Sequence, residues 1–242
     1  MPGKLRPKNQ LKSKPTAGSA APKGTPPGLA SDVANIRKEL QSFLRSEGVD
    51  KKRIGSAQFG VYAFYDYDGE PIYVGQTYEG LGARIGRHLT NQRTDAVAMN
   101  VLDPFEVAEI RVWPLALEGM DLDLARAYLN RVEYTVFQKV LAESKLSAVL
   151  NEKPPRPTEI VELPQDYRKR IIPDSIYPHR KHPDIRIARR ASTIANLARV
   201  ISERKVSRGL RQTLLTQALR LEHLAAERLK DFAQQEESEQ DD

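Results

Sequence analysis

Two tyrosines flank a turn signal in the run GVYAFYDYDGEPIYVG, and their hydroxyls are candidate acid–base groups. The aromatic and β-branched residues on either side of Asp68-Gly69 predict a β-hairpin. A two-residue turn would place Tyr62 opposite Gly75, and would make Tyr62 and Tyr73 diagonal neighbours on one face of the sheet. The missing side chain at Gly75 would leave space beside the phenol. Tyrosines in a strand are more often half-buried sheet residues than a catalytic pair, so both interpretations are open.

The segment ARIGRHL, which follows the hairpin after a glycine-containing loop, predicts a short helix that begins near Ala83. Arg84 and His88 are four residues apart, so they share one face of this helix. A guanidinium beside an imidazole suits a phosphate, because the guanidinium donates hydrogen bonds from a planar fork and the imidazole transfers protons. A solvated helix face explains Arg87 equally well, and it is also an alternative explanation of Arg84.

Glu133 stands where a core residue is expected. Residues 121–143 predict a long amphipathic helix, and Leu129 and Phe137 lie one turn before and one turn after Glu133 on its apolar side. A carboxylate in this position requires a partner, because an unpaired buried charge is unfavourable. The partner is either a salt-bridging side chain, for which Arg84 is the candidate, or a divalent cation at the edge of the core.

Five sequence elements, taken in order, resemble the GIY-YIG nuclease family. They are the two halves of its signature, Gly60-Val61-Tyr62 and Tyr73-Val74-Gly75, its Arg-x-x-x-His helix with Arg84 and His88, its metal-binding glutamate at Glu133, and its closing asparagine at Asn151. The loop before the helix is about one residue longer than is usual in the family. The spacing to His88 favours Arg84 over Arg87 as the functional arginine. The resemblance covers about residues 58–152.

The resemblance implies a metal-dependent endonuclease that hydrolyses DNA phosphodiester bonds, in repair, recombination or defence. Because Glu133 is the one acid available, a single Mg²⁺ or Mn²⁺ ion fits better than a two-metal site. Tyr62 would take a proton from the attacking water, with Tyr73 as the alternative base, and Arg84 would neutralise charge on the scissile phosphate. The resemblance gives the remaining residues of the set orienting, proton-relaying or structural roles: Tyr73, His88 and Asn151.

The order of hairpin, helix, strand and helix predicts an α+β fold, in which a three-stranded antiparallel sheet is flanked by helices. The third strand is expected within residues 105–113, and two amphipathic stretches at about 185–203 and 207–232 predict a C-terminal helical hairpin. The expected organisation is a disordered basic tail (1–30), an N-terminal helix and connection (31–57), the catalytic domain (58–152), a proline-rich linker (153–184), a basic helical region (185–233) and an acidic disordered tail (234–242).

Most of the excess positive charge lies outside the predicted catalytic domain. The chain has 38 Lys and Arg against 32 Asp and Glu, and residues 167–211 hold thirteen basic and only three acidic residues. DNA would repel the acidic central domain at long range, so the basic helical region is expected to supply the attraction. Arg186, Arg189 and Arg190 share a helix face and, with Arg87, are the predicted phosphate contacts. The alternative is a solvated helix face or a dimerisation element.

Composition excludes several other classes. The chain has no cysteine, which excludes disulfides, thiolate zinc sites and a cysteine nucleophile. No apolar run approaches the ~20 residues of a membrane span, and the basic N-terminus lacks the apolar segment of a secretory signal, so a cytoplasmic location and no membrane partner are expected. Two alternatives to a DNA-cleaving enzyme are a non-catalytic DNA-binding or scaffolding protein with the same fold, and an RNA-cleaving nuclease. A homodimer through the C-terminal helices is a further expectation.

Overall fold

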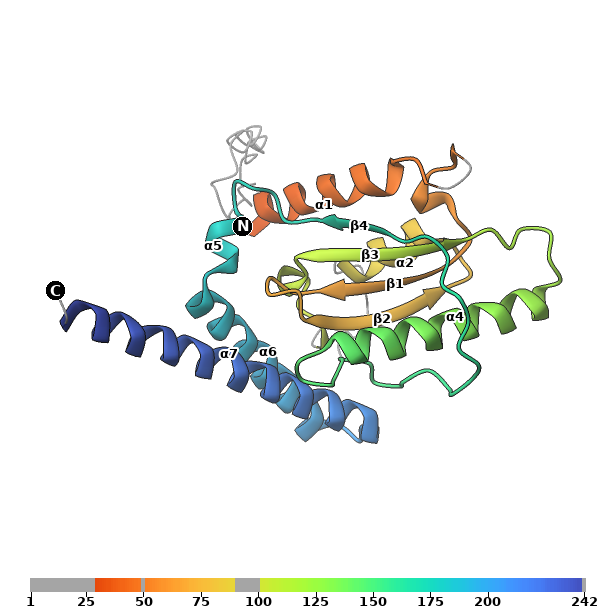
Figure 1. Ribbon diagram of the computed structural model, residues 1–242. Coiled ribbons are helices and arrows are strands. Elements are labelled where there is room, and N and C mark those ends of the chain that lie inside the picture. Colours follow the sequence, from red (N-terminus) through yellow and green to blue (C-terminus); the bar gives the residue numbers. More distant parts are fainter. Residues whose placement is uncertain (1–28, 49–50, 90–100, 241–242) are drawn as a thin grey trace, which may run out of the picture.

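The computed structural model describes residues 29–48, 51–89 and 101–240, so nearly all of the predicted basic tail lies outside the described residues. Four antiparallel strands form one sheet: β1 (Phe59–Tyr65), β2 (Pro71–Thr77), β3 (Glu109–Leu115) and β4 (Tyr167–Arg170). Their order across the sheet is β2-β1-β3-β4, and helices surround them (Figure 1). The predicted α+β fold with an antiparallel sheet is confirmed.

The number of strands differs from the predicted three. β4 lies inside residues 153–184, which were expected to be an extended linker, and it pairs antiparallel with β3 at the edge of the sheet. Its sequence, YRKR, has no apolar alternation because the strand is largely exposed. The same segment contains the short helix α5 (Tyr177–Lys181), so the linker prediction is wrong for this part of the chain.

The turn between β1 and β2 has three residues instead of the predicted two. Asp66 and Glu70 close it, because the Asp66 N–H donates to the Glu70 carbonyl (2.9 Å). The Asp66 carboxylate also accepts hydrogen bonds from the backbone N–H groups of Asp68 (2.9 Å) and Glu70 (3.0 Å). Gly69 has a φ of +73°, a conformation that glycine adopts without steric cost. The Asp66 side chain therefore stabilises a longer loop than the Asp-Gly signal alone predicts.

The predicted strand pairing is confirmed in spite of the longer turn, since a register shift between Phe64 and Tyr65 compensates for the extra residue. Tyr62 lies opposite Gly75, and Phe64 lies opposite Tyr73. Both tyrosines of the motif consequently point to the same face of the sheet.

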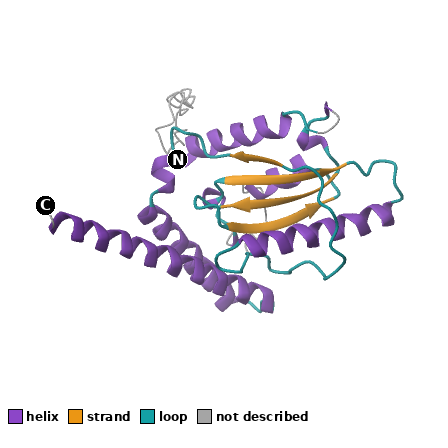
Figure 2. Cartoon of the chain, viewed as in Figure 1, coloured by secondary structure: helices purple, strands orange, loops and turns teal. Residues whose placement is uncertain are grey.

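Helices pack on both faces of the sheet (Figure 2). Helix α2 (Leu81–Leu89) packs against β1, and α4 (Leu122–Glu143) packs against β1 and β2. Helix α1 (Leu29–Arg45) packs against α2 and contributes to the same core. Alternate residues of β1 point to opposite faces, so Tyr62 packs in the core beneath α1 and α2, while Val61 packs in the core beneath α4. The predicted long helix is confirmed as α4, and the carboxylate of Asp121 caps its first turn.

The predicted C-terminal helical hairpin is confirmed. Its helices are α6 (Pro183–Glu203) and α7 (Arg208–Gln240), which pack against each other along their length. Because α7 continues to Gln240, the prediction of a disordered tail at 234–242 is wrong for nearly all of that segment. Glutamate and glutamine are good helix formers, which favours this continuation. The last turns of α7 extend away from the rest of the protein (Figure 1).

The arginines that were expected to form a DNA-binding face on α6 are buried against the sheet domain. Arg186 is 1% exposed and Arg190 is 5% exposed. Asp66 Oδ2 accepts hydrogen bonds from Arg190 (2.9 Å) and from Arg220 of α7 (2.7 Å), and lies 3.2 Å from a guanidinium nitrogen of Arg186. Glu106 accepts a further hydrogen bond from Arg190 (3.0 Å). Arg186 and Arg190 are thus structural ion pairs, and their assignment as phosphate contacts is wrong.

Arg189 is also engaged with an acid, because its guanidinium lies 2.5 Å from the Asp103 carboxylate. Helical spacing indicated correctly that the three arginines share one side of α6, but spacing alone does not show whether that side faces water or protein. The arginines face the protein because their acidic partners lie there, at the tip of the β1–β2 hairpin and in the 3-10 helix η3 (Pro104–Glu106). The C-terminal helices are therefore fastened to the sheet domain by ion pairs.

Candidate active site

Strand β1 and helix α2 bring a phenol and an imidazole together. The hydroxyl oxygen of Tyr62 lies 2.9 Å from His88 Nε2, and both side chains are buried, Tyr62 completely. The ring of Tyr73 on β2 joins this pair, with its centroid 5.3 Å from that of His88 and 6.2 Å from that of Tyr62. Tyr73 is only partly buried, so of the two phenols it is the one that solvent reaches.

The two motif glycines permit this packing. A Cβ at Gly75 would lie 2.6 Å from the hydroxyl oxygen of Tyr62 and 2.8 Å from the ring of Tyr73, so any larger residue would displace both phenols. A Cβ at Gly60 would lie 2.7 Å from the side chain of Leu81, at the start of α2. Gly75 therefore makes room for the phenols, and Gly60 lets α2 approach β1 closely.

Arg84 lies one turn before His88 on α2 and interacts with the Tyr62 hydroxyl. Partial burial lowers the pKa of Arg84, but its interactions with Tyr62 and Tyr73 outweigh the burial, so the pKa lies above its ordinary value. The guanidinium therefore stays charged. Its Nε is buried and has no hydrogen-bond partner among the residues that the structure describes. A cationic donor in this condition is suited to an anionic ligand such as a phosphate.

Glu133 on α4 contributes the carboxylate of the site. Burial raises the pKa of Glu133 to about 7, while the positive charge of Arg84 acts in the opposite direction. The side chain is half-buried, and within residues 29–48, 51–89 and 101–234 it forms no ion pair and no hydrogen bond. Of the two partners predicted for Glu133, a salt bridge with Arg84 or a divalent cation, the salt bridge does not form among the described residues. The carboxylate thus lies near a cation without being neutralised by it.

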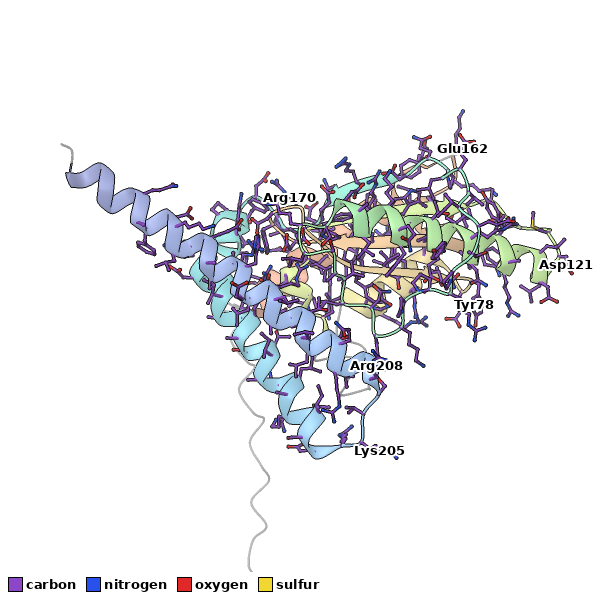
Figure 3. All side chains as sticks on the ribbon, turned by 60° about the horizontal axis from the view of Figure 1, so that its bottom comes forward. Tyr78, Asp121, Glu162, Arg170, Lys205 and Arg208 are labelled. Carbon is purple, nitrogen blue, oxygen red and sulfur yellow. The ribbon has the colours of Figure 1, made fainter. Side chains whose placement is uncertain are left out.

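Two residues of α4 that precede Glu133 contact the end of β2 and the loop that follows it. Asn130, one turn before Glu133, accepts a hydrogen bond from Gln76 of β2 (2.9 Å). One turn further, the guanidinium of Arg126 lies over the ring of Tyr78, 5.0 Å from its centroid. The i, i+4, i+7 spacing of the three α4 residues is visible in the sequence and could have revealed these contacts, which motif matching missed. Tyr78 lies beside α4 at the surface (Figure 3).

Asn151 fixes the backbone of β2 behind the site. Its side-chain carbonyl accepts a hydrogen bond from the Val74 N–H (3.0 Å), and its amide donates to the Val74 carbonyl (2.7 Å). The backbone of Leu150 adds a hydrogen bond to the carbonyl of Ile72 (2.7 Å). Asn151 therefore extends the sheet beyond its edge strand and holds the segment that carries Tyr73.

The surface of α2 has a separate ion pair. Arg87 donates to Glu79 (2.8 Å), and this hydrogen bond lowers the pKa of the Glu79 carboxyl. Both side chains are largely exposed. Arg87 belongs to the rim of the site, whereas Arg84 belongs to its interior.

The structure thus brings four of the predicted residues together from three elements: Tyr62, Tyr73, Arg84 and His88. Glu133 is linked to this cluster through its charge interaction with Arg84. The α6 arginines lie elsewhere, at the tip of the β1–β2 hairpin. No cluster of three or more His, Cys, Asp or Glu side chains that could hold a metal ion occurs within the described residues. Glu133 is therefore a lone carboxylate. A magnesium ion commonly takes only one or two protein carboxylates and fills its other positions with water and phosphate oxygens, so the donor set fits such an ion.

Comparison with protein-family models, with curated proteins and with solved structures gave no match for this chain. Among the helices of the described residues, none is both long enough and apolar enough to cross a membrane.

Proposed function

We propose that this protein is a metal-dependent endonuclease of the GIY-YIG type that hydrolyses DNA phosphodiester bonds. The observation that carries the proposal is the pair formed by Glu133 and Arg84. Within the described part of the chain, Glu133 is a half-buried carboxylate with a raised pKa and no cation bonded to it, and the buried Nε of Arg84 has no acceptor. Such a pair is complementary to a divalent cation beside a phosphate, because each ligand supplies the charge that one side chain lacks.

Glu133 is the residue that would hold Mg²⁺ or Mn²⁺. When bound, the ion would reduce the negative charge that develops on the leaving oxygen. Arg84 would bind the scissile phosphate with its charged fork, and its pKa guarantees that the charge is present at neutral pH.

Tyr62 and His88 would move the proton of the attacking water. A phenol with a pKa near ~10 is a weak base at neutral pH, whereas imidazole has an ordinary pKa of ~6.5. With the proton on the other ring nitrogen, His88 Nε2 accepts the Tyr62 hydroxyl proton across 2.9 Å. Tyr62 would then take the proton of the water as it passes its own to His88. Tyr73, which solvent reaches, is the alternative group to contact that water.

Substrate contacts would come from the rim of the cluster, since the α6 arginines are buried. Tyr78 is 45% exposed and is backed by Arg126. Arg126 lies seven residues before Glu133 on α4, or about 10 Å along the helix axis. An exposed aromatic ring beside a cation is suited to stacking on a nucleic-acid base. Tyr78→Ala should accordingly raise KM and leave kcat nearly unchanged.

The experiment that tests the function is cleavage of a substrate panel by the full chain with Mg²⁺ or Mn²⁺. The panel contains supercoiled plasmid, flaps, forks, single strands and RNA. Tyr62→Phe should slow cleavage about 100-fold or more, because a positioned acid–base group contributes that much. Tyr65→Phe removes a hydroxyl from the same strand on the opposite face and is the matched control.

Cleavage that persists in Glu133→Ala, or in excess chelator, would contradict the metal-dependent mechanism. DNA binding without cleavage by the unmodified chain would favour a scaffolding protein instead. Cleavage restricted to RNA would identify an RNA-cleaving nuclease.

A further inference from the structure

Helix α7 carries an exposed apolar stripe. Four of its large apolar side chains are exposed to solvent: Leu215 (53%), Leu219 (43%), Leu229 (72%) and Phe232 (45%). Exposed alanines lie between them on the same side of the helix, at positions 218 and 225. Single exposed leucines are common, but an apolar stripe that recurs on one side of a helix over about five turns is typical of an interaction surface.

The opposite side of α7 is already used. Leu210, Thr213, Arg220 and Leu224 are buried, and they face α6 and the sheet domain. The buried and exposed stripes lie on opposite sides of the helix, because the exposed residues are offset from the buried ones by about half a turn. The guanidinium of Arg228, on the same helix, lies over the ring of Phe232, 4.1 Å from its centroid, while Leu215, Leu219 and Leu229 remain exposed. Helix α7 runs beside α6, and its C-terminal end extends away from the sheet domain (Figure 3).

The exposed residues follow the spacing of a coiled-coil seam. Alternating steps of three and four residues connect the positions 215, 218, 222, 225, 229 and 232, which carry Leu, Ala, Glu, Ala, Leu and Phe. Glu222 is the single polar residue of this seam. The pattern is therefore suited to packing against another helix, with one polar position that restricts the register.

The charges at the two ends of α7 are self-complementary. Arg208 and Arg211 are exposed at its start, directly after the basic pair at residues 204–205. Its last turns carry the sequence EESEQ, which contains three glutamates. A parallel pair of α7 helices would place like charges together, whereas an antiparallel pair places the basic end of each helix beside the acidic end of the other.

We propose that the exposed stripe of α7 binds the same stripe of a second copy of this chain, in an antiparallel coiled coil with twofold symmetry. Leu215 packs against the partner's Phe232, Ala218 against the partner's Leu229, and Glu222 against the partner's Ala225. This register keeps the two Glu222 side chains apart. A twofold interface pairs a surface with the same surface of the other copy, so that surface must be self-complementary. Both the apolar stripe and the opposite charges at the two ends of α7 meet this requirement. The inference is independent of the proposed nuclease activity.

The oligomeric state of the full chain provides the first test. Sedimentation should show a dimer at micromolar concentration, and Leu229→Glu should raise its dissociation constant about 100-fold or more, because a buried leucine is lost from each copy. Leu124→Glu is the matched control, since Leu124 is 63% exposed on α4 and lies outside the stripe. A monomeric unmodified chain would overturn the proposal, as would a Leu229→Glu dimer of unchanged stability.

Cysteine crosslinking provides the second test and reports the orientation. The chain has no cysteine of its own, so each introduced thiol acts alone. Under mild oxidation, the double variant Leu215→Cys with Phe232→Cys should form a covalent dimer, while each single variant should not. Efficient crosslinking of both single variants would indicate a parallel pair and overturn the proposed arrangement. A double variant that stays uncrosslinked would overturn the register.

Discussion

Replacing Glu133 by glutamine should make the protein more stable while it abolishes cleavage. Glutamine keeps the shape of the side chain and removes its charge. Burial raises the pKa of Glu133 to about 7 from 4.5. Each unit of pKa is worth about 1.4 kcal/mol, so the full difference corresponds to at most about 3.5 kcal/mol of lost stability in the ionised state. Partial contact of the carboxylate with water reduces this, and we expect a gain of about 1–2 kcal/mol for Glu133→Gln above neutral pH.

The pH dependence follows from the sign of that difference. The pKa of the folded state lies above that of the unfolded state, so ionisation of Glu133 disfavours folding. The destabilisation is complete above about pH 8, decreases as the pH falls through about 7, and disappears near the ordinary carboxyl value. The stability difference between Glu133→Gln and the unmodified chain should therefore be large at high pH and vanish in mild acid.

Thermal unfolding in the presence of chelator measures this effect. At about pH 8 the Tm of Glu133→Gln should exceed that of the unmodified chain by about 3–6 °C, and at about pH 5 the two should agree within a degree or so. Asp123→Asn, on the same helix but fully exposed, is the control and should give no gain. Added Mg²⁺ should raise the Tm of the unmodified chain and not that of Glu133→Gln. Equal or lower stability of Glu133→Gln at high pH would refute the reasoning, because it would mean that a protein group already compensates the carboxylate.

Two further predictions concern the packing of the site and of the C-terminal helices. Gly75→Ala should destabilise the protein by about 1–3 kcal/mol and abolish cleavage, because the new methyl group meets the Tyr62 hydroxyl at 2.6 Å. Gly86→Ala is the control, since a Cβ there meets nothing within 4 Å. It should be neutral or stabilising in the same thermal and cleavage assays. Asp66→Asn should cost about 3–5 kcal/mol in urea unfolding, because three buried arginines lose their shared anion, whereas Asp174→Asn at an exposed ion pair should change stability by less than about 1 kcal/mol.

The sequence was most informative where a pattern is local. The α+β class, the hairpin pairing and α4 follow from periodicity and turn signals within short windows, and all three are confirmed. The length of the hairpin turn was wrong, because the Asp66 side chain binds two backbone N–H groups and stabilises a three-residue loop. A register shift then restores the pairing of Tyr62 with Gly75. The two tyrosines of the motif were thus predicted in the correct relation although the turn between them was not.

Contacts between segments that are far apart in the chain were not predicted from the sequence. β4 is a polar edge strand of four residues, and no apolar pattern marks it. The α6 arginines were assigned to the surface because charged side chains are usually exposed. Their partners lie far earlier in the chain: Asp66 is 124 residues before Arg190, and Asp103 is 86 residues before Arg189. The basic residues of 167–211 were therefore located correctly, but the α6 arginines neutralise acids of the same chain and not the phosphates of DNA.

The contrast between two buried carboxylates is the strongest reason to regard Glu133 as functional. Asp66 is 4% exposed and is surrounded by the guanidinium groups of Arg186, Arg190 and Arg220. This chain therefore has the means to neutralise a buried acid completely. Glu133 has Arg84 in its vicinity, yet its pKa is raised to about 7 because that charge does not outweigh burial. If the Glu133 carboxylate had only a structural role, the folded protein would be more stable with a cation closer to it, or with an apolar residue in its place. A half-buried acid near Arg84 whose charge is not compensated within the described residues suits a site whose missing positive charge arrives with a metal ion.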